Sequence, residues 1–332
     1  KPVHVNPHHV KKSKELDDNN PNKNDRKDPK TIAALVNEGR FSYPYIPTGI
    51  YAEIRSLSNL RIQTQEEISR IKNRIARWFS IYFPEMKDVY KKPDAKSGMM
   101  VIKKAPLPAD IKELGVDGVN QIWRDAKLKG AGLKRAKTLV EVAERSIGNT
   151  EAPGSARIEI RMLLSDYEVY SKRMDDLMTE IEKKLSEIPY IDKLLEINGV
   201  GIKTVSCFVA EVGDISRFDN PKQLQKLAGY AIVSNDSGKH NGESRISHRG
   251  RKRLRYALYE AAISVIGKNP EFKSIHEYYL TRTKNPLKKM QSVIAIACKL
   301  IRVFYMILTK GVDYDGQKML NDIVRPEIAA AE

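Results

Sequence analysis

A serine followed by glycine, inside a run of turn-forming residues, is the first place in this chain where chemistry could occur. Ser237 precedes Gly238 in the polar segment 234–239, SNDSGK. Asn, Asp, Ser and Gly all favour turns, so the segment is not a helix interior or a core strand, and we expect the hydroxyl to be reachable. Such a serine is either a nucleophile or an ordinary residue of a surface loop that caps a helix, and composition leaves both open.

Positive charge follows this serine closely. Five of the seven residues from 249 to 255 are basic, and no acidic residue lies between Ser244 and Arg255. Because guanidinium groups bind phosphate oxygens and stabilise charge on them, the pattern indicates phosphodiester chemistry in which the hydroxyl attacks phosphorus. His240 and His248 could act as general bases, but we interpret them as phosphate contacts or loop residues. The expected phosphate-binding side chains are Lys239, Arg245, Arg249, Arg251, Lys252, Arg253 and Arg255.

Glycine-containing corners offer two further phosphate sites. Gly199 and Gly201 flank Val200 between two apolar helical patterns, with Lys203 just after them, which is a helix-hairpin-helix pattern. Its backbone N–H groups could approach a phosphate without reading bases, and the alternative is a tight helical corner. The segment 129–143, KGAGLKRAKTLVEVA, leaves a similar choice between a phosphate at a helix N-terminus and a helix-turn-helix packing unit.

Two carboxylates near the N-terminus could hold a metal ion. Asp25 and Asp28 are three positions apart, just before the apolar helical pattern of residues 32–36. If the helix begins near Asn24, both carboxylates face one side and could bind a divalent cation. If it begins at Asp28, with Pro29 at the first helical position, Asp28 is an N-cap residue.

The composition limits the class of protein. A chain of 332 residues predicts two or three domains, and a net charge of +16 with a pI of 9.6 predicts a polyanionic partner. We expect nucleic acid and no membrane, because no apolar run approaches transmembrane length. Cys207 and Cys298 lie apart in apolar helical patterns, which argues against a disulfide framework or zinc site and favours a reducing compartment. The chain opens on VHVNP, interpreted as the end of a buried strand, so we expect sequence upstream.

Two long helices with matching heptads are the elements that must position these residues. Apolar residues recur at three-four spacing from Ile54 to Tyr82 and again from Ile160 to Ile188, which predicts a coiled coil. Residues 1–28 are expected to be mostly loop with a short strand at 3–5, and residues 107–147 to form short glycine-hinged helices. Two apolar helices, 254–266 and 286–309, are expected to hold the serine loop.

The order of these motifs resembles the DEDD transposases of the insertion-sequence one-ten family, also called bridge-RNA-guided serine recombinases and related to the Piv DNA invertase. The resemblance covers essentially the whole chain and is most specific in its last third: GVG, GDISRF, LAGY, SG, RISHRGRKRLRYAL and KKMQSVIAIACKLIRVFY. It implies a mainly α protein with a remnant of an α/β RuvC-like (RNase H-like) domain, a long coiled coil, and an all-α C-terminal transposase domain with a helix-hairpin-helix motif. The implied boundaries are 1–53 for the RuvC-like part, 54–90 and 156–190 for the coiled-coil arms, 91–155 for a segment associated with the RuvC-like domain, and 191–332 for the transposase domain.

The resemblance also assigns chemistry. It implies Ser237 as a nucleophile joined to DNA, with Ser234 a weaker candidate because no glycine follows it, and Asp25 and Asp28 as ligands of Mg²⁺. The implied partners are donor and target DNA, a structured bridge RNA and further copies of the chain, as a dimer or tetramer, in the bacterial cytoplasm near the nucleoid. Two departures stand out: Pro29 replaces the usual alanine, and the family's first Asp and Glu would lie upstream of Lys1. A metal-dependent structure-specific nuclease and a non-catalytic nucleic-acid-binding remnant are the alternatives.

Overall fold

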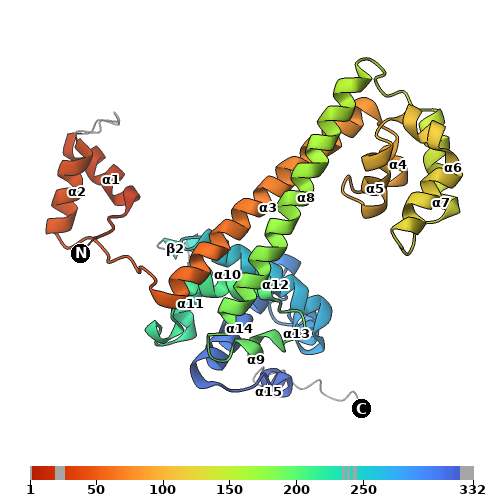
Figure 1. Ribbon diagram of the computed structural model, residues 1–332. Coiled ribbons are helices and arrows are strands. Elements are labelled where there is room, and N and C mark those ends of the chain that lie inside the picture. Colours follow the sequence, from red (N-terminus) through yellow and green to blue (C-terminus); the bar gives the residue numbers. More distant parts are fainter. Residues whose placement is uncertain (1, 19–26, 234–235, 238–239, 242–244, 322–332) are drawn as a thin grey trace, which may run out of the picture.

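The computed structural model describes residues 2–18, 27–233, 236–237, 240–241 and 245–321. It is mainly helical, as the sequence predicts. Figure 1 shows a small N-terminal helix pair, a stalk of two long helices, and a helical body at each end of that stalk. In chain order the helices outside the C-terminal body are α1 (Pro7–Asp18), α2 (Lys27–Asn37), α3 (Gly49–Tyr82), α4 (Met86–Val89), α5 (Lys96–Lys104), α6 (Pro108–Asp125), α7 (Leu133–Glu144) and α8 (Pro153–Leu185).

The stalk consists of α3 and α8, which run side by side in opposite directions (Figure 1). The two predicted long helices are thus confirmed, and α3, with 34 residues, is about 50 Å long at the rise of an α-helix. Burial along the seam is greatest toward its ends, where Ile54 and Ile75 are fully buried, whereas Arg61 and Thr64 in the middle are only half-buried. Supercoiling of the pair stays a prediction.

A distal module forms at the end of the stalk where α3 ends and α8 begins. It comprises α4 to α7 together with the adjoining halves of α3 and α8, and its core spans residues 71–164. Two buried tryptophans fix it: the Trp78 indole donates to the Ala156 carbonyl at 3.1 Å, and the Trp123 indole donates to the Ser97 carbonyl at 2.9 Å. Residues 91–155 therefore pack on the stalk.

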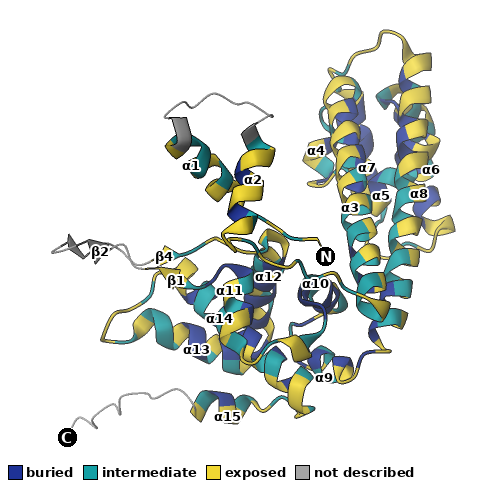
Figure 2. Ribbon diagram, turned by 90° about the vertical axis from the view of Figure 1, so that its left-hand side faces the viewer, coloured by how far each residue is buried: buried dark blue, intermediate teal, exposed yellow. Residues whose placement is uncertain are grey.

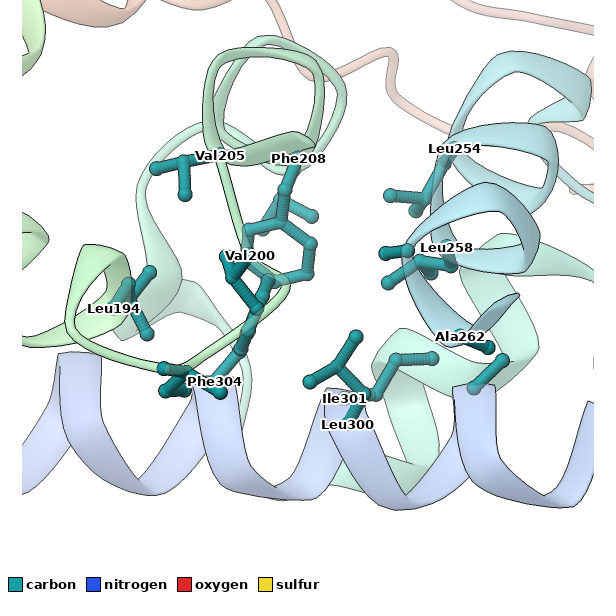
Figure 3. Close-up of a cluster of buried hydrophobic side chains, with 14 of the residues drawn as sticks. Leu194, Val200, Val205, Phe208, Leu254, Leu258, Ala262, Leu300, Ile301 and Phe304 are labelled. Carbon is teal, nitrogen blue, oxygen red and sulfur yellow. The ribbon is translucent and has the colours of Figure 1, made fainter. Parts of the chain in front are cut away.

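The C-terminal body surrounds the apolar helix α14. Its helices are α9 (Ile191–Leu195), α10 (Ile202–Val212), the 3₁₀ turn η1 (Ile215–Arg217), α11 (Pro221–Ala228), α12 (Lys252–Lys268), α13 (Pro270–Thr281), α14 (Lys289–Lys310) and α15 (Gly316–Asn321). Figure 3 shows Phe208 of α10 and Leu258 of α12 directed toward Phe304 and Ile301 of α14. The two predicted apolar helices are confirmed, and α13 is an additional helix between them.

One expectation about apolar length needs correction. Among the described helices, α14 is long and apolar enough to cross a membrane, so an apolar run of that length does exist in the chain. The reason is that α14 is central to the C-terminal core: Ile296, Leu300, Phe304 and other residues along it are fully buried against α10, α12 and α13.

The N-terminal segment is also more ordered than its composition predicts. Residues 7–18 form α1, because the Asn6 side chain accepts the His8 N–H at 3.0 Å and Pro7 occupies the first helical position. The strand expected at residues 3–5 is a single bridge between His4 and Ser42. Figure 2 shows α1 and α2 standing apart from both buried cores. A RuvC-like fold for this part stays a prediction.

The C-terminal body is not entirely α-helical either. Between α11 and α12 the chain forms four two-residue strands, β1 (Ile232–Val233), β2 (Asp236–Ser237), β3 (His240–Asn241) and β4 (Arg245–Ile246). β1 pairs with β4 and β2 with β3, both antiparallel. We call residues 232–246 the serine hairpin. The polar composition predicted turns here but not the backbone pairing on either side of them.

Candidate nucleic-acid interface around the serine hairpin

Ser237 lies in the outer of the two ladders of the serine hairpin. The inner ladder pairs Ile232 with Ile246, and the outer ladder pairs Ser237 with His240. Ile246 of the inner ladder is partly buried against the C-terminal core, whereas Ile232 opposite it is 75% exposed, so only the base of the hairpin touches the core. Ser234 and Lys239 lie outside the described residues. The backbone therefore carries Ser237 away from the body of the protein.

The root of the hairpin is held by Arg255, one turn into α12. Its Nη1 donates hydrogen bonds to the carbonyls of Ala228 and His248, both at 3.1 Å, and these two residues begin and end the loop. The Tyr230 hydroxyl donates to the Arg255 carbonyl at 2.8 Å, and burial raises the pKa of this phenol far above its usual range. Gly229 has a φ of +78°, and a Cβ there would lie 2.6 Å from the Arg255 Nη1. Arg255 is therefore a structural clamp.

The Arg251 side chain is also bound by other residues of the protein. Its Nη1 donates to the main-chain carbonyl of Glu211 at 2.7 Å and lies 3.2 Å from the Glu211 carboxylate. The two side chains are only 24% and 13% exposed, so this ion pair is largely sheltered from water. It joins the start of α12 to the end of α10.

The other cations of the cluster face solvent. Arg245, Arg249 and Lys252 are exposed and form no ion pair with another described residue. Arg253 is exposed and its Nη1 donates to the Asn59 side chain of α3 at 2.6 Å, so the base of the stalk adjoins the cluster. Exposed guanidinium and ammonium groups without carboxylate partners are suited to bind a phosphate backbone.

The glycine corner before α10 has a packing role. Gly199 has a φ of +98°, and a Cβ there would lie 2.8 Å from the Val265 Cα of α12. A side chain at this position would collide with the α12 backbone, so the tight helical corner accounts for Gly199. Gly201 is exposed at the N-cap of α10, and Lys203 is exposed in its first turn. These two residues remain suited to contact a phosphate.

Of the two predicted metal ligands, only Asp28 lies among the described residues. Asp28 lies in the first turn of α2 and its carboxylate forms an ion pair with Lys14 of α1. Asp25 lies outside the described residues. Within the described ranges no three His, Cys, Asp or Glu side chains gather as metal ligands would. The residues that can be placed therefore do not fit a Mg²⁺ ion by themselves.

The sequence alone does not predict the roles of three residues in this region. Glu211 binds Arg251, the N-cap residue of α12, and Asn59 and Tyr230 bind Arg253 and Arg255 within α12. Their partners lie 40, 194 and 25 positions away, so no local pattern connects them. Only the packing of α10 against α12 reveals that Arg251 is already neutralised, by the Glu211 carboxylate.

Comparison with known proteins adds the family. Residues 191–277 match a family model described as "Transposase IS116/IS110/IS902 family", and residues 1–84 match the IS110-type DEDD model, described as a transposase. The first match covers the C-terminal body from α9 to α13, including the serine hairpin, and the second covers α1 to α3. Together the two models account for just over half of the chain.

Individual relatives agree with these models. The chain is 24% identical over 291 residues to the insertion element IS116 uncharacterized 44.8 kDa protein of Streptomyces clavuligerus, covering 86% of this chain and 71% of the relative. It is 20% identical to the insertion element IS110 uncharacterized 43.6 kDa protein of Streptomyces coelicolor, over 81% of this chain and 65% of the relative. A pilin gene-inverting protein of Moraxella lacunata is 30% identical over 146 residues, 43% of this chain and 44% of the relative. By these matches the chain belongs to the IS116/IS110/IS902 family of transposases.

Proposed function

We propose that this protein is the recombinase of an insertion element, which cuts and rejoins DNA strands with Ser237 as the nucleophile. The supporting observation is the position of Ser237 on a hairpin whose root is clamped by Arg255 and flanked by the exposed cations Arg249 and Lys252. A relative with a matching segment is named for inverting a pilin gene, which is a rearrangement of DNA.

In the proposed reaction the Ser237 hydroxyl oxygen forms a bond to a backbone phosphorus, and the bond from that phosphorus to the 3′ oxygen breaks. The hydroxyl proton leaves the serine, and the departing 3′ oxygen gains a proton. The product is a phosphoserine that conserves the energy of the broken ester, so attack by the 3′ hydroxyl of another strand reverses the step and rejoins DNA. Arg249 and Lys252 would bind the non-bridging oxygens and stabilise their charge.

Metal and RNA dependence belong to this proposal as expectations of the family. DEDD transposases are typically metal-dependent, and Mg²⁺ held in part by Asp25 and Asp28 is the expected cofactor. Since Asp28 is paired with Lys14, that ion pair would have to open first. Sequence choice is expected to come from a bridge RNA that pairs with donor and target DNA, which leaves the protein to hold backbones. Exchange between two duplexes needs several serines, so a dimer or tetramer is expected.

Covalent trapping tests the nucleophile. The product of the intact gene is incubated with Mg²⁺ and a DNA substrate that cannot religate, and the adduct is mapped by peptide mass spectrometry. We expect phosphate on Ser237, loss of the adduct in Ser237→Ala, and nearly unchanged DNA affinity, because one neutral hydroxyl adds little to binding by cations. Ser234→Ala is the matched control and should retain the adduct.

The same experiment separates the alternatives. A structure-specific nuclease that uses water would cut DNA equally well as Ser237→Ala and would form no adduct. A non-catalytic remnant would bind DNA without cutting it. An adduct on Ser234 or on a tyrosine would overturn the assignment of Ser237.

A further inference from the structure

A second basic surface lies in the distal module, around the turn between α6 and α7. No acidic residue occurs between Asp125 and Glu141, and every Lys and Arg in that interval is exposed. We call these side chains the distal basic surface; they are Lys127, Lys129, Lys134, Arg135 and Lys137. The turn itself requires glycine at residue 130, where φ is +81°. It connects two helices that pack closely on each other.

These charges are not neutralised within the protein. None of the five forms an ion pair with another residue in the part of the chain that the structure describes, in contrast to Arg251 beside Glu211. Lys134 and Arg135 line a surface hollow together with Gly130 and Gly132. The acid in that hollow, Asp88, is itself paired with Arg145 at 3.7 Å. Lys127 and Lys129 lie in the turn, and Lys134, Arg135 and Lys137 lie in the first half of α7. Five like charges within eleven residues repel one another, so an anionic partner would relieve that repulsion.

The kind of nucleic acid that this surface could bind follows from its exposed basic side chains and from the burial of the nearby aromatic rings. Proteins that bind single strands stack bases on exposed aromatic rings. Tyr90, whose ring centroid lies 5.8 Å from the Arg135 Cζ, and Trp123, whose carbonyl accepts the Leu128 N–H, are both buried in the distal core. Lysine and arginine without exposed aromatic rings are suited to the phosphates of a double helix, which they bind without reading its sequence.

The distal basic surface is remote from the serine hairpin. The base of the hairpin packs on the C-terminal core through Ile246, whereas the helices α6 and α7 on either side of the turn contribute to the separate distal core. Figure 1 shows the two bodies at opposite ends of the stalk, whose helix α3 is about 50 Å long. A phosphate contact at the α6–α7 turn therefore cannot be part of the site at Ser237.

We propose that the distal basic surface binds the backbone of duplex DNA away from the bonds that are cut, so that the stalk connects two separate DNA contacts. The proposal rests on the inferred DNA substrate but not on Ser237 chemistry. DNA is favoured over RNA because the relative that is named for an action acts on a gene.

Salt-dependent binding tests this surface. The intact protein and a variant with Gln at all five positions are titrated with a 40-bp duplex of arbitrary sequence between about 50 and 200 mM salt. Each phosphate contact contributes about 0.9 to the slope of log K against log salt, so we expect the slope to fall by roughly 2 to 4 and the affinity at 100 mM salt to fall tenfold or more. The loss should be alike for unrelated sequences.

Two matched variants separate a local surface from general charge. The first changes the same number of exposed lysines to Gln in the C-terminal body, at Lys268, Lys273, Lys284, Lys310 and Lys318. It has the same net charge and should lose little affinity. The second replaces the four lysines of the distal basic surface with Arg, which preserves charge and should retain binding. The melting curves followed by circular dichroism should be unchanged in all variants, because substitutions of exposed polar residues rarely alter stability.

Three outcomes would overturn the proposal: an unchanged salt slope in the five-site variant, an equal loss in the C-terminal control, or a loss confined to structured RNA. Adduct formation at Ser237 is measured separately on a short duplex. If Ser237 fails to form an adduct while the five-site variant still loses duplex affinity, the proposed nucleophile is wrong and the distal surface stands.

Discussion

The Nη1 of Arg255 lies 3.1 Å from the carbonyl oxygen of His248, seven positions earlier in the chain, and the same nitrogen also reaches Ala228. The two carbonyls belong to opposite sides of the serine hairpin's root. A guanidinium of α12 therefore sets where the hairpin leaves the C-terminal body.

Arg255→Met is expected to loosen that root. It keeps an unbranched apolar stem but removes the guanidinium and leaves two backbone carbonyls without their donor, which costs about 1–3 kcal/mol. We expect faster proteolysis within residues 232–246 and a loss of Ser237 adduct that exceeds the loss of DNA affinity. Lys252→Met removes a neighbouring exposed charge and is the control, expected to weaken DNA binding with unchanged proteolysis. Equal proteolysis of the two variants would contradict a clamping role.

Arg251→Ala is expected to destabilise the fold, although the sequence groups Arg251 with its phosphate-binding neighbours. Removing it leaves the sheltered Glu211 carboxylate without its cation, at a cost of roughly 2–4 kcal/mol. Urea unfolding measures this, and Lys252→Ala should unfold like the wild type. A double variant, Arg251→Met with Glu211→Met, should recover much of the loss. If Arg251→Ala were fully stable, the pair would not hold α12 to α10.

The ion pair between Lys14 and Asp28 gives a test of the metal hypothesis. As a partly exposed pair it should contribute less than about 1 kcal/mol to stability, so Lys14→Met and Asp28→Asn should melt alike. Their activities should differ: Lys14→Met should keep DNA cleavage, whereas Asp28→Asn should lose it by removing a carboxylate ligand. Equal retention of cleavage in both variants would leave Asp28 as a structural residue of α1 and α2 only.

His276 predicts a loss of stability on acidification. It is buried, its Nδ1 lies 2.7 Å from the Ser292 hydroxyl, and burial followed by repulsion from Lys289 lowers its pKa below the usual 6.5. The unfolded chain therefore binds a proton that the folded chain resists, and stability falls as the pH drops below about 6.5. The melting temperature should fall between pH 7.5 and 5.5, and His276→Asn should reduce that fall. An unchanged pH dependence in the variant would exclude His276 as its source.

Self-association should involve the exposed apolar residues of the stalk and not its buried seam. Ile71 is 5% exposed inside the distal core, so a charge there would unfold the module, whereas Leu60 and Val169 are 48% and 44% exposed on α3 and α8. We expect Leu60→Glu with Val169→Glu to reduce the mass measured by light scattering without loss of helicity. A mass that equals one chain in both proteins would assign oligomerisation to the nucleic acids.

Local sequence patterns predict the long helices well, because their apolar residues recur over many turns. The same patterns predict poorly those features that depend on a residue far away in the sequence. The spacing of Ile54, Ile68 and Ile75 predicts α3, and the apolar run around Ile301 predicts α14. The sequence does not predict α1, because this helix is polar and lacks an apolar face, and the Asn6 side chain caps its first turn. Charge counting likewise treats Arg249 and Arg251 alike.

The difference between those two arginines comes from tertiary packing. Arg251 faces Glu211 across the contact of α12 with α10, whereas Arg249 faces solvent. The same limit applies to Gly199, which the sequence offers as a phosphate contact and which the α12 backbone requires for close approach. In each case the deciding partner lies tens of residues away, beyond the reach of a local motif.

The stalk helices α3 and α8 lie on either side of the distal module in the sequence, and this arrangement affects the order in which the chain can fold. Ile54 and Ile181 both belong to the C-terminal core, yet the whole distal core, residues 71–164, lies between them in sequence. Closing so long an unstructured loop would slow the search for native contacts. The distal core is contiguous in sequence, so it can form first. Once it has formed, α3 and α8 can pair progressively from the distal end. This pairing brings Ile54 close to Ile181 before the C-terminal body folds. We therefore expect refolding of the C-terminal body to wait for the distal module, although the two cores share no buried residue.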